Sequence, residues 1–77
     1  MRVEEIRSIL TENPHQLIEL YLTRGRRVLA RGLDYVFFPP SSQTIIVAVP
    51  EGGYAIIDCL TISDVRTAQR RKQGRGV

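Results

Sequence analysis

The sequence is poor in cysteine and histidine, with one residue of each, Cys59 and His15. A domain this small buries only roughly 60% of the surface of its unfolded chain and usually needs disulfides, a metal or a partner for support. One cysteine cannot form an intramolecular disulfide, and two soft ligands fall short of the four that a structural zinc site uses. We therefore expect the domain to be supported by association with another chain.

Long apolar runs are also absent, because no stretch approaches the roughly 18 residues of a membrane-spanning helix. Glu4 and Glu5 stand where a secretory signal peptide would be apolar. A lone cysteine is typical of proteins in reducing compartments. We therefore expect no membrane contact and a cytoplasmic location.

Positive charge is concentrated at one end of the chain. The net charge of the whole sequence is +3, yet residues 1–69 contain seven arginines against eight acidic residues, a net charge of −1. The excess lies in the last eight residues, as Arg70, Arg71, Lys72 and Arg75. Apolar residues become rare in the same region, which is typical of a flexible tail. We predict one domain over residues 1–67 and a basic tail over residues 68–77.

Apolar periodicity predicts a short helix followed by β-strands. Helical spacing relates Val3, Ile6, Ile9 and Leu10, and Asn13-Pro14 should end this helix. Strand patterns follow over residues 17–23, 27–38, 44–49 and 54–60, with a bend at Gly32 in the second strand. Residues 61–65 fit either a last strand or a helical turn. The predicted fold class is mostly β with one N-terminal helix: a small bent antiparallel sheet or a partly open barrel of SH3-like or Sm-like type.

The hairpin over residues 44–60 is apolar at nearly every position. Antiparallel strands with one solvated face should alternate clearly between apolar and polar residues, and these two strands do not. Both faces should therefore be covered, one by the domain interior and the helix and the other by a second subunit. Alternation places Asp58 in the same row as Tyr54, Ile56 and Leu60.

The polar residues do not form a catalytic group in the sequence pattern. We interpret His15 as a solvated loop residue and Cys59 as a small buried hydrophobe. Asp58 should pair with Arg27 or Arg31, and a binding role is the alternative. Enzymes need a nucleophile beside a base or two facing carboxylates, so we expect no enzymatic activity and no small-molecule substrate. We likewise predict no catalytic, cofactor-binding or metal-binding residues.

Four arginines lie within eight residues around the first turn: Arg24, Arg26, Arg27 and Arg31. Together with Arg70, Arg71 and Lys72 of the tail, they are the candidate nucleic-acid contacts, because guanidinium groups suit phosphates and Tyr21 and Tyr35 could stack on bases. The alternative is a solvated hairpin whose arginines pair with Glu19, Asp34 or Asp64. We favour this alternative because the domain as a whole is not basic.

Two resemblances follow from these motifs. The order of elements resembles the Sm-like fold, including Hfq-type proteins. It consists of a helix, a strand ending in Tyr21-Leu22-Thr23-Arg24-Gly25, a strand bent at Gly32 and a last strand around Ile62-Ser63-Asp64-Val65. That resemblance covers residues 3–67 and implies ring assembly and RNA binding. The Sm aspartate and asparagine pattern is not evident at residues 34–38, and Asp58-Cys59 stands where Hfq-type proteins have a basic-histidine motif. No RNA-binding residue is therefore carried over.

The second resemblance is to short bacterial proteins of similar length for which no function is established. The shared features are a proline near position 14, a Thr23-Arg24-Gly25-Arg26 turn, a turn over residues 50–53 and Ile57-Asp58 before the last strand. The resemblance covers residues 3–66 and implies a fold but no activity. From the sequence we expect a non-enzymatic binding or assembly module that self-associates through sheet edges or the 44–60 hairpin. The alternative is an Sm-like RNA-binding protein that uses the hairpin arginines and the tail.

Overall fold

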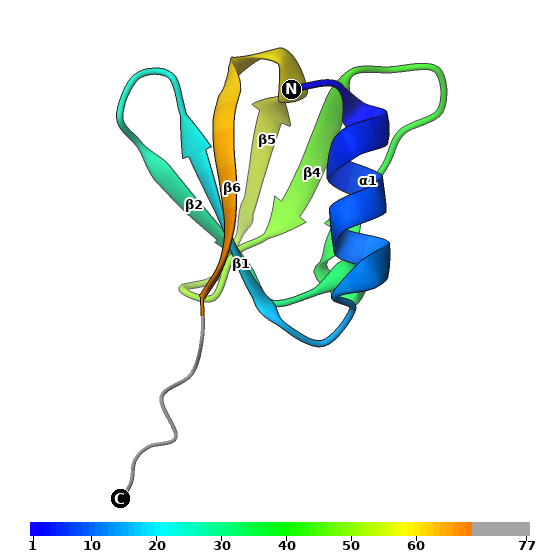
Figure 1. Ribbon diagram of the computed structural model, residues 1–77. Coiled ribbons are helices and arrows are strands. Elements are labelled where there is room, and N and C mark those ends of the chain that lie inside the picture. The colour runs from blue at the N-terminus through cyan, green and yellow to red at the C-terminus, as the bar shows by residue number, and fades with distance from the viewer. Residues whose placement is uncertain (69–77) are drawn as a thin grey trace, which may run out of the picture.

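The structure, a computed structural model, describes residues 1–68 as one helix and six short strands (Figure 1). The elements are α1 (Val3–Glu12), β1 (Leu17–Leu22), β2 (Arg27–Ala30), β3 (Val36–Phe37), β4 (Thr44–Ala48), β5 (Tyr54–Asp58) and β6 (Ile62–Ala68). Two 3₁₀ turns, over Leu33–Tyr35 and Cys59–Thr61, precede β3 and β6. The predicted fold class is confirmed: the domain is mostly β, with one N-terminal helix.

The strands form two antiparallel sheets around a common core. One sheet has the order β2-β1-β6 and the other has the order β3-β4-β5. Their inner faces meet, and α1 lies beside β4 along one side of the pair (Figure 1). The centre of the core contains fully buried side chains from the helix and from both sheets, including Ile6, Leu10, Leu20, Ile45 and Val47. The two sheets do not close into a barrel, because β2 and β5 are not hydrogen-bonded to each other.

Tertiary contacts hold α1 in place, since ten residues are too few for an isolated helix to be stable in water. The N-terminal ammonium of Met1 donates hydrogen bonds to the carbonyl oxygens of Cys59 (3.0 Å) and Ile62 (2.8 Å). The backbone N–H of Val3 donates to Oε1 of Gln43 at 2.8 Å. At the other end, the side chain of Asn13 donates to the carbonyl of Ile9 at 2.8 Å, and the helix ends there as predicted.

The prediction of one bent strand over residues 27–38 is wrong in detail. β2 ends at Ala30, and the chain passes through a 3₁₀ turn into β3, which belongs to the other sheet. Gly32 makes this change of sheet possible, because its φ of 148° and ψ of −176° fall in a region that is essentially open only to glycine. A Cβ atom at Gly32 would also collide with the carbonyl oxygen of Pro14, which accepts a hydrogen bond from the N–H of Leu33 at 3.2 Å.

The hairpin from β4 to β5 forms as predicted. The structure also decides between a strand and a helical turn for residues 61–65, most of which belong to β6. Gly52 and Gly53 have positive φ angles of 104° and 82° in the connecting turn. Residues 59–61 form a 3₁₀ turn, and β6 then continues to Ala68, which pairs with Leu17 of β1. Ala68, the first residue of the predicted tail, thus ends a strand, and residues 69–77 lie outside the described part. None of the helices in residues 1–68 is long and apolar enough to cross a membrane.

Candidate interaction surfaces

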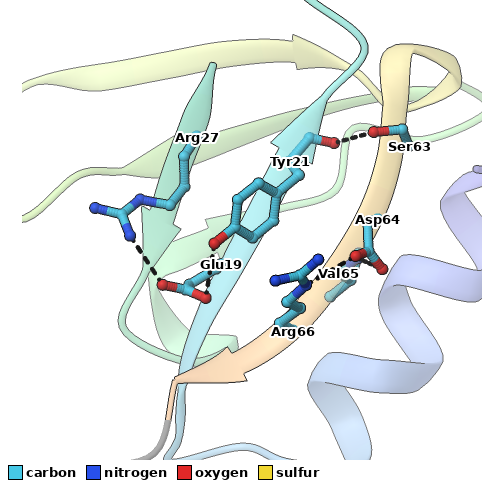
Figure 2. A network of polar contacts seen from close by, with 7 residues as sticks. All are labelled: Glu19, Tyr21, Arg27, Ser63, Asp64, Val65 and Arg66. Atoms are coloured by element: carbon cyan, nitrogen blue, oxygen red, sulfur yellow. Dashed lines mark hydrogen bonds and ion pairs between the residues drawn. The ribbon is translucent and has the colours of Figure 1, made fainter. Parts of the chain in front are cut away.

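The outer face of the β2-β1-β6 sheet carries a network of paired polar groups (Figure 2). Glu19 on β1 accepts a hydrogen bond from Nη1 of Arg27 at 3.0 Å and another from the hydroxyl of Tyr21 at 3.1 Å. The guanidinium of Arg66 lies over the Tyr21 ring, 4.8 Å from its centre, and donates through Nε to Oδ2 of Asp64 at 2.9 Å. This face is thus polar, and most of its charged groups neutralise one another.

The network shows which partners Arg27 and Tyr21 have, and their nucleic-acid role stays a prediction. Arg27 pairs with Glu19, as the solvated-hairpin interpretation expects. Of the two other acidic residues expected to pair with the hairpin, Asp64 pairs with Arg66 instead, and Asp34 takes part in none of the ion pairs within residues 1–68. The guanidinium of Arg66 lies over the ring of Tyr21.

The four hairpin arginines do not share one surface. Arg31 lies at the far end of β2, where Nη2 donates to the carbonyl of Pro50 at 3.3 Å and the guanidinium lies 5.6 Å from the centre of the Tyr35 ring. Arg24 and Arg26 lie in the turn between β1 and β2, are exposed, and take part in none of the ion pairs within residues 1–68. The candidate tail contacts Arg70, Arg71 and Lys72 lie outside the described residues.

Three residues could in principle take part in catalysis: His15, Cys59 and Asp58. Within residues 1–68 of the structure, each is either exposed without a catalytic partner beside it or has a structural role. His15 is exposed in the connector after α1. Cys59 is fully buried, and burial raises the pKa of its thiol. Asp58 does not pair with Arg27 or Arg31, because it begins the 3₁₀ turn: Oδ1 accepts from the N–H of Leu60 at 3.0 Å. Residues 1–68 hold no group of three or more side chains suited to a metal.

The outer face of the β3-β4-β5 sheet is apolar. Phe37 of β3 pairs with Ile46 of β4, which in turn pairs with Ile56 of β5, so the three side chains form a row across the sheet. Phe37 is 60% exposed and Ile56 is 74% exposed, and Tyr54 beside them is 76% exposed. We call this surface, made of Phe37, Ile46, Tyr54 and Ile56, the apolar face. Thr44 and Asp58, two residues along from Ile46 and Ile56, make one end of it polar.

The sequence pattern indicated part of the apolar face and missed the rest. Strand alternation predicts one row of Tyr54, Ile56, Asp58 and Leu60, and the structure confirms that Tyr54 and Ile56 are exposed while Ile57 is buried. The predicted strand over residues 54–60 is too long, because Leu60 lies in the 3₁₀ turn that follows β5, where it is also exposed. Phe37 was missed as a member because its strand was predicted to continue β2. Only the pairing of β3 with β4 brings Phe37 beside Ile46.

A groove lies between β2 and β5, where the barrel would otherwise close. Its volume is about 430 Å³, within the usual range for ligand sites. Apolar side chains line it from both sheets, including Leu22 and Val28 on one side and Ala55 and Ile57 on the other. Polar residues line it as well: Thr23, Arg24 and Arg26 from the first turn, with Asp58 and Thr61 opposite. Two of the predicted site residues thus belong to a concave surface that the sequence did not reveal.

Comparison of the chain with protein-family models, with curated protein sequences and with solved structures found no match. A function for this chain is therefore inferred from these surfaces alone.

Proposed function

We propose that this protein is a non-enzymatic assembly module whose subunits associate through the apolar face. The observation that carries the proposal is the row of Phe37, Ile46 and Ile56 across three strands, in which Phe37 and Ile56 are exposed and Ile46 between them is half-buried. The other sheet of the same domain has a polar outer face, as expected of a solvated antiparallel sheet. A large exposed apolar patch on a small domain marks an interaction surface.

A second copy of the chain is the occupant that fits the apolar face best. Packed sheets align their strands within about 30°. A two-fold axis along β4 would place Ile46 against Ile46 of the partner subunit and Phe37 against Ile56 of the partner subunit. Aromatic side chains bury roughly 150–250 Å² each when covered, so Phe37 and Tyr54, which are 60% and 76% exposed, supply about 200–340 Å² per subunit. Ile46, Ile56 and the flanking residues would supply the rest of the roughly 1,200 Å² that a specific interface buries.

The positions of Cys59, Asp58 and His15 support a binding role over catalysis. Cys59 is buried in the core, and the carboxylate of Asp58 caps a turn. His15 is exposed in a connector, away from any predicted partner base or nucleophile. Nucleophilic and general-base catalysis both require such groups within hydrogen-bond reach of each other.

Light scattering coupled to size exclusion tests the association on the full chain. The wild-type protein should have the mass of a dimer at about 100 μM, and Ile56→Lys should be a monomer because a buried ammonium in an apolar interface is strongly unfavourable. Thr67→Lys, which adds the same charge at an exposed site on β6, is the matched control and should remain a dimer. A monomeric wild type, or an unchanged mass for Ile56→Lys, would contradict the proposal.

A cross-linking experiment tests the two-fold geometry separately. The double variant Ile46→Cys with Cys59→Ala has one thiol per chain, on the axis of the expected dimer. A bismaleimide cross-linker that spans about 10 Å, the spacing of packed sheets, should give a covalent dimer within minutes. Thr67→Cys in the same background should give far less, because β6 lies in the other sheet. Equal rates for the two variants would argue against this interface.

A further inference from the structure

The groove between β2 and β5 has two unpaired strand edges as its walls. The N–H of Cys59 donates to the carbonyl of Gln43 at 2.7 Å and the N–H of Val49 to that of Gly53 at 3.2 Å, which fixes the alternation along β5. The peptide groups of Ile56, one position out of phase with these pairs, therefore point away from β4 and toward the groove. No backbone hydrogen bond joins β2 to β5 in residues 1–68.

The opposite wall repeats this arrangement. The N–H of Leu22 donates to the carbonyl of Arg26 at 2.9 Å, so the next bonded pair along the ladder is Leu20 with Val28. The peptide groups of Arg27 and Leu29 consequently point away from β1. An extended chain placed in the groove would find backbone donors and acceptors on one side or both. Strand addition of this kind is a common mode of peptide recognition.

The side chains of the groove divide into an apolar floor and a charged rim. Val28 and Ile57 are nearly fully buried and close the floor, and Leu22 and Ala55 extend it. Arg24 and Arg26 stand at the rim with no ion pair inside residues 1–68, and Asp58, whose Oδ1 accepts from the N–H of Leu60, lies opposite, so these three groups give the rim a net charge of +1. Because an extended peptide directs alternate side chains to opposite sides, it could bury one row on the floor and present the other to the arginines.

We propose that this groove binds an extended, acidic segment of another protein, which adds to the free edge of β2 or β5 as a strand. Charge complementarity selects this occupant, because two unpaired guanidinium groups favour carboxylates, with which they form bidentate hydrogen bonds. The tail of this chain is a poor occupant, since Arg70, Arg71 and Lys72 carry the same sign of charge as the rim. The proposal uses strand edges and does not require association through the apolar face, although Ile56 lines both surfaces.

The test uses a fluorescein-labelled, six-residue peptide of alternating valine and glutamate, amidated at its C-terminus. Six residues span roughly 20 Å, enough to follow the five residues of β5. Fluorescence anisotropy with the full chain should show saturable binding that weakens as salt is added. The same peptide with lysine in place of glutamate should bind at least tenfold more weakly. Equal affinity for the two peptides would overturn the proposal.

Paired double variants locate the site. Arg24→Ala with Arg26→Ala should weaken binding of the glutamate peptide about tenfold. Arg27→Ala with Arg31→Ala makes the same change of charge outside the groove and should alter the affinity less than twofold. Equal losses in the two variants would overturn the proposal. So would displacement of the peptide by a six-nucleotide single-stranded RNA that needs all four arginines, which would make the surface a nucleic-acid site.

Amide hydrogen exchange separates strand addition from simple charge attraction. Binding of the glutamate peptide should slow exchange at Leu29 or Ile56, whose N–H groups face the groove. Leu29→Pro removes one of these donors at a position where an edge strand tolerates proline, and it should reduce any protection along β2. Unchanged exchange at both amides under saturating peptide would overturn the proposal. If the double variant Arg24→Ala with Arg26→Ala changed its oligomeric mass but bound the peptide as tightly as before, the groove would instead be a contact with a second copy of the chain.

Discussion

Replacing Gly32 with alanine tests the physical account of how the chain moves from one sheet to the other. The backbone of Gly32 has φ 148° and ψ −176°, where a residue with a side chain is strained by about 1–3 kcal/mol. The new Cβ would also collide with the carbonyl oxygen of Pro14, which is backbone and cannot turn aside. We expect Gly32→Ala to lower the free energy of unfolding by about 3 kcal/mol or more.

Such a loss is large for this domain. Its 68 described residues, at 0.05–0.15 kcal/mol each, suggest a total stability of roughly 3–10 kcal/mol. Gly25→Ala is the matched control: its φ is 88°, but nothing lies within 4 Å of the added Cβ, so only the backbone strain of about 1 kcal/mol applies. Urea unfolding followed by far-ultraviolet circular dichroism measures both variants. A Gly32→Ala protein as stable as Gly25→Ala would refute the reasoning.

Three further substitutions test the core, the polar face and the thiol. Leu10→Ala, which empties a fully buried site on α1, should cost about 2–5 kcal/mol in urea unfolding, and a loss below 1 kcal/mol would show that α1 contributes little to the core. Glu19→Gln weakens an ion pair whose arginine is half exposed and whose glutamate is 17% exposed, and it should cost about 1 kcal/mol; a clearly larger loss would mean that the network in Figure 2 acts cooperatively. Cys59 should resist a thiol reagent in the native protein and react on unfolding. Because burial raises its pKa above 9.0, the unfolded thiol ionises first, so native stability should fall more above pH 9 than that of Cys59→Ala.

Local sequence patterns were sufficient to predict the helix and most strands. They did not predict which strands pair, because pairing depends on residues far apart in the sequence. The helix over Val3–Glu12 and the β4–β5 hairpin follow from periodicity and turn residues, which act over a few neighbouring positions. The exchange of sheets at Gly32 depends on the carbonyl of Pro14, which is distant along the chain. A glycine in a strand pattern indicates a bend or a bulge, but it does not say which sheet the chain joins afterwards.

The same limit explains the candidate sites. The four arginines near the first turn are neighbours in sequence, yet a strand directs successive side chains to opposite faces and separates them further along its length. Arg27 thus joins Glu19, Arg31 approaches Pro50, and only Arg24 and Arg26 reach the groove. The groove needs the edges of β2 and β5 to approach without pairing, and no local pattern encodes that approach.

The apolar face and the groove should respond differently to solution conditions. Burial of the apolar face would give association a negative heat-capacity change, and the association should weaken on cooling and strengthen in sulfate. The groove, with Arg24 and Arg26 at its rim, should respond oppositely to salt, because added ions screen exposed charges. Raising the concentration of sulfate should therefore shift the protein from binding an acidic partner in the groove to binding a second copy through the apolar face.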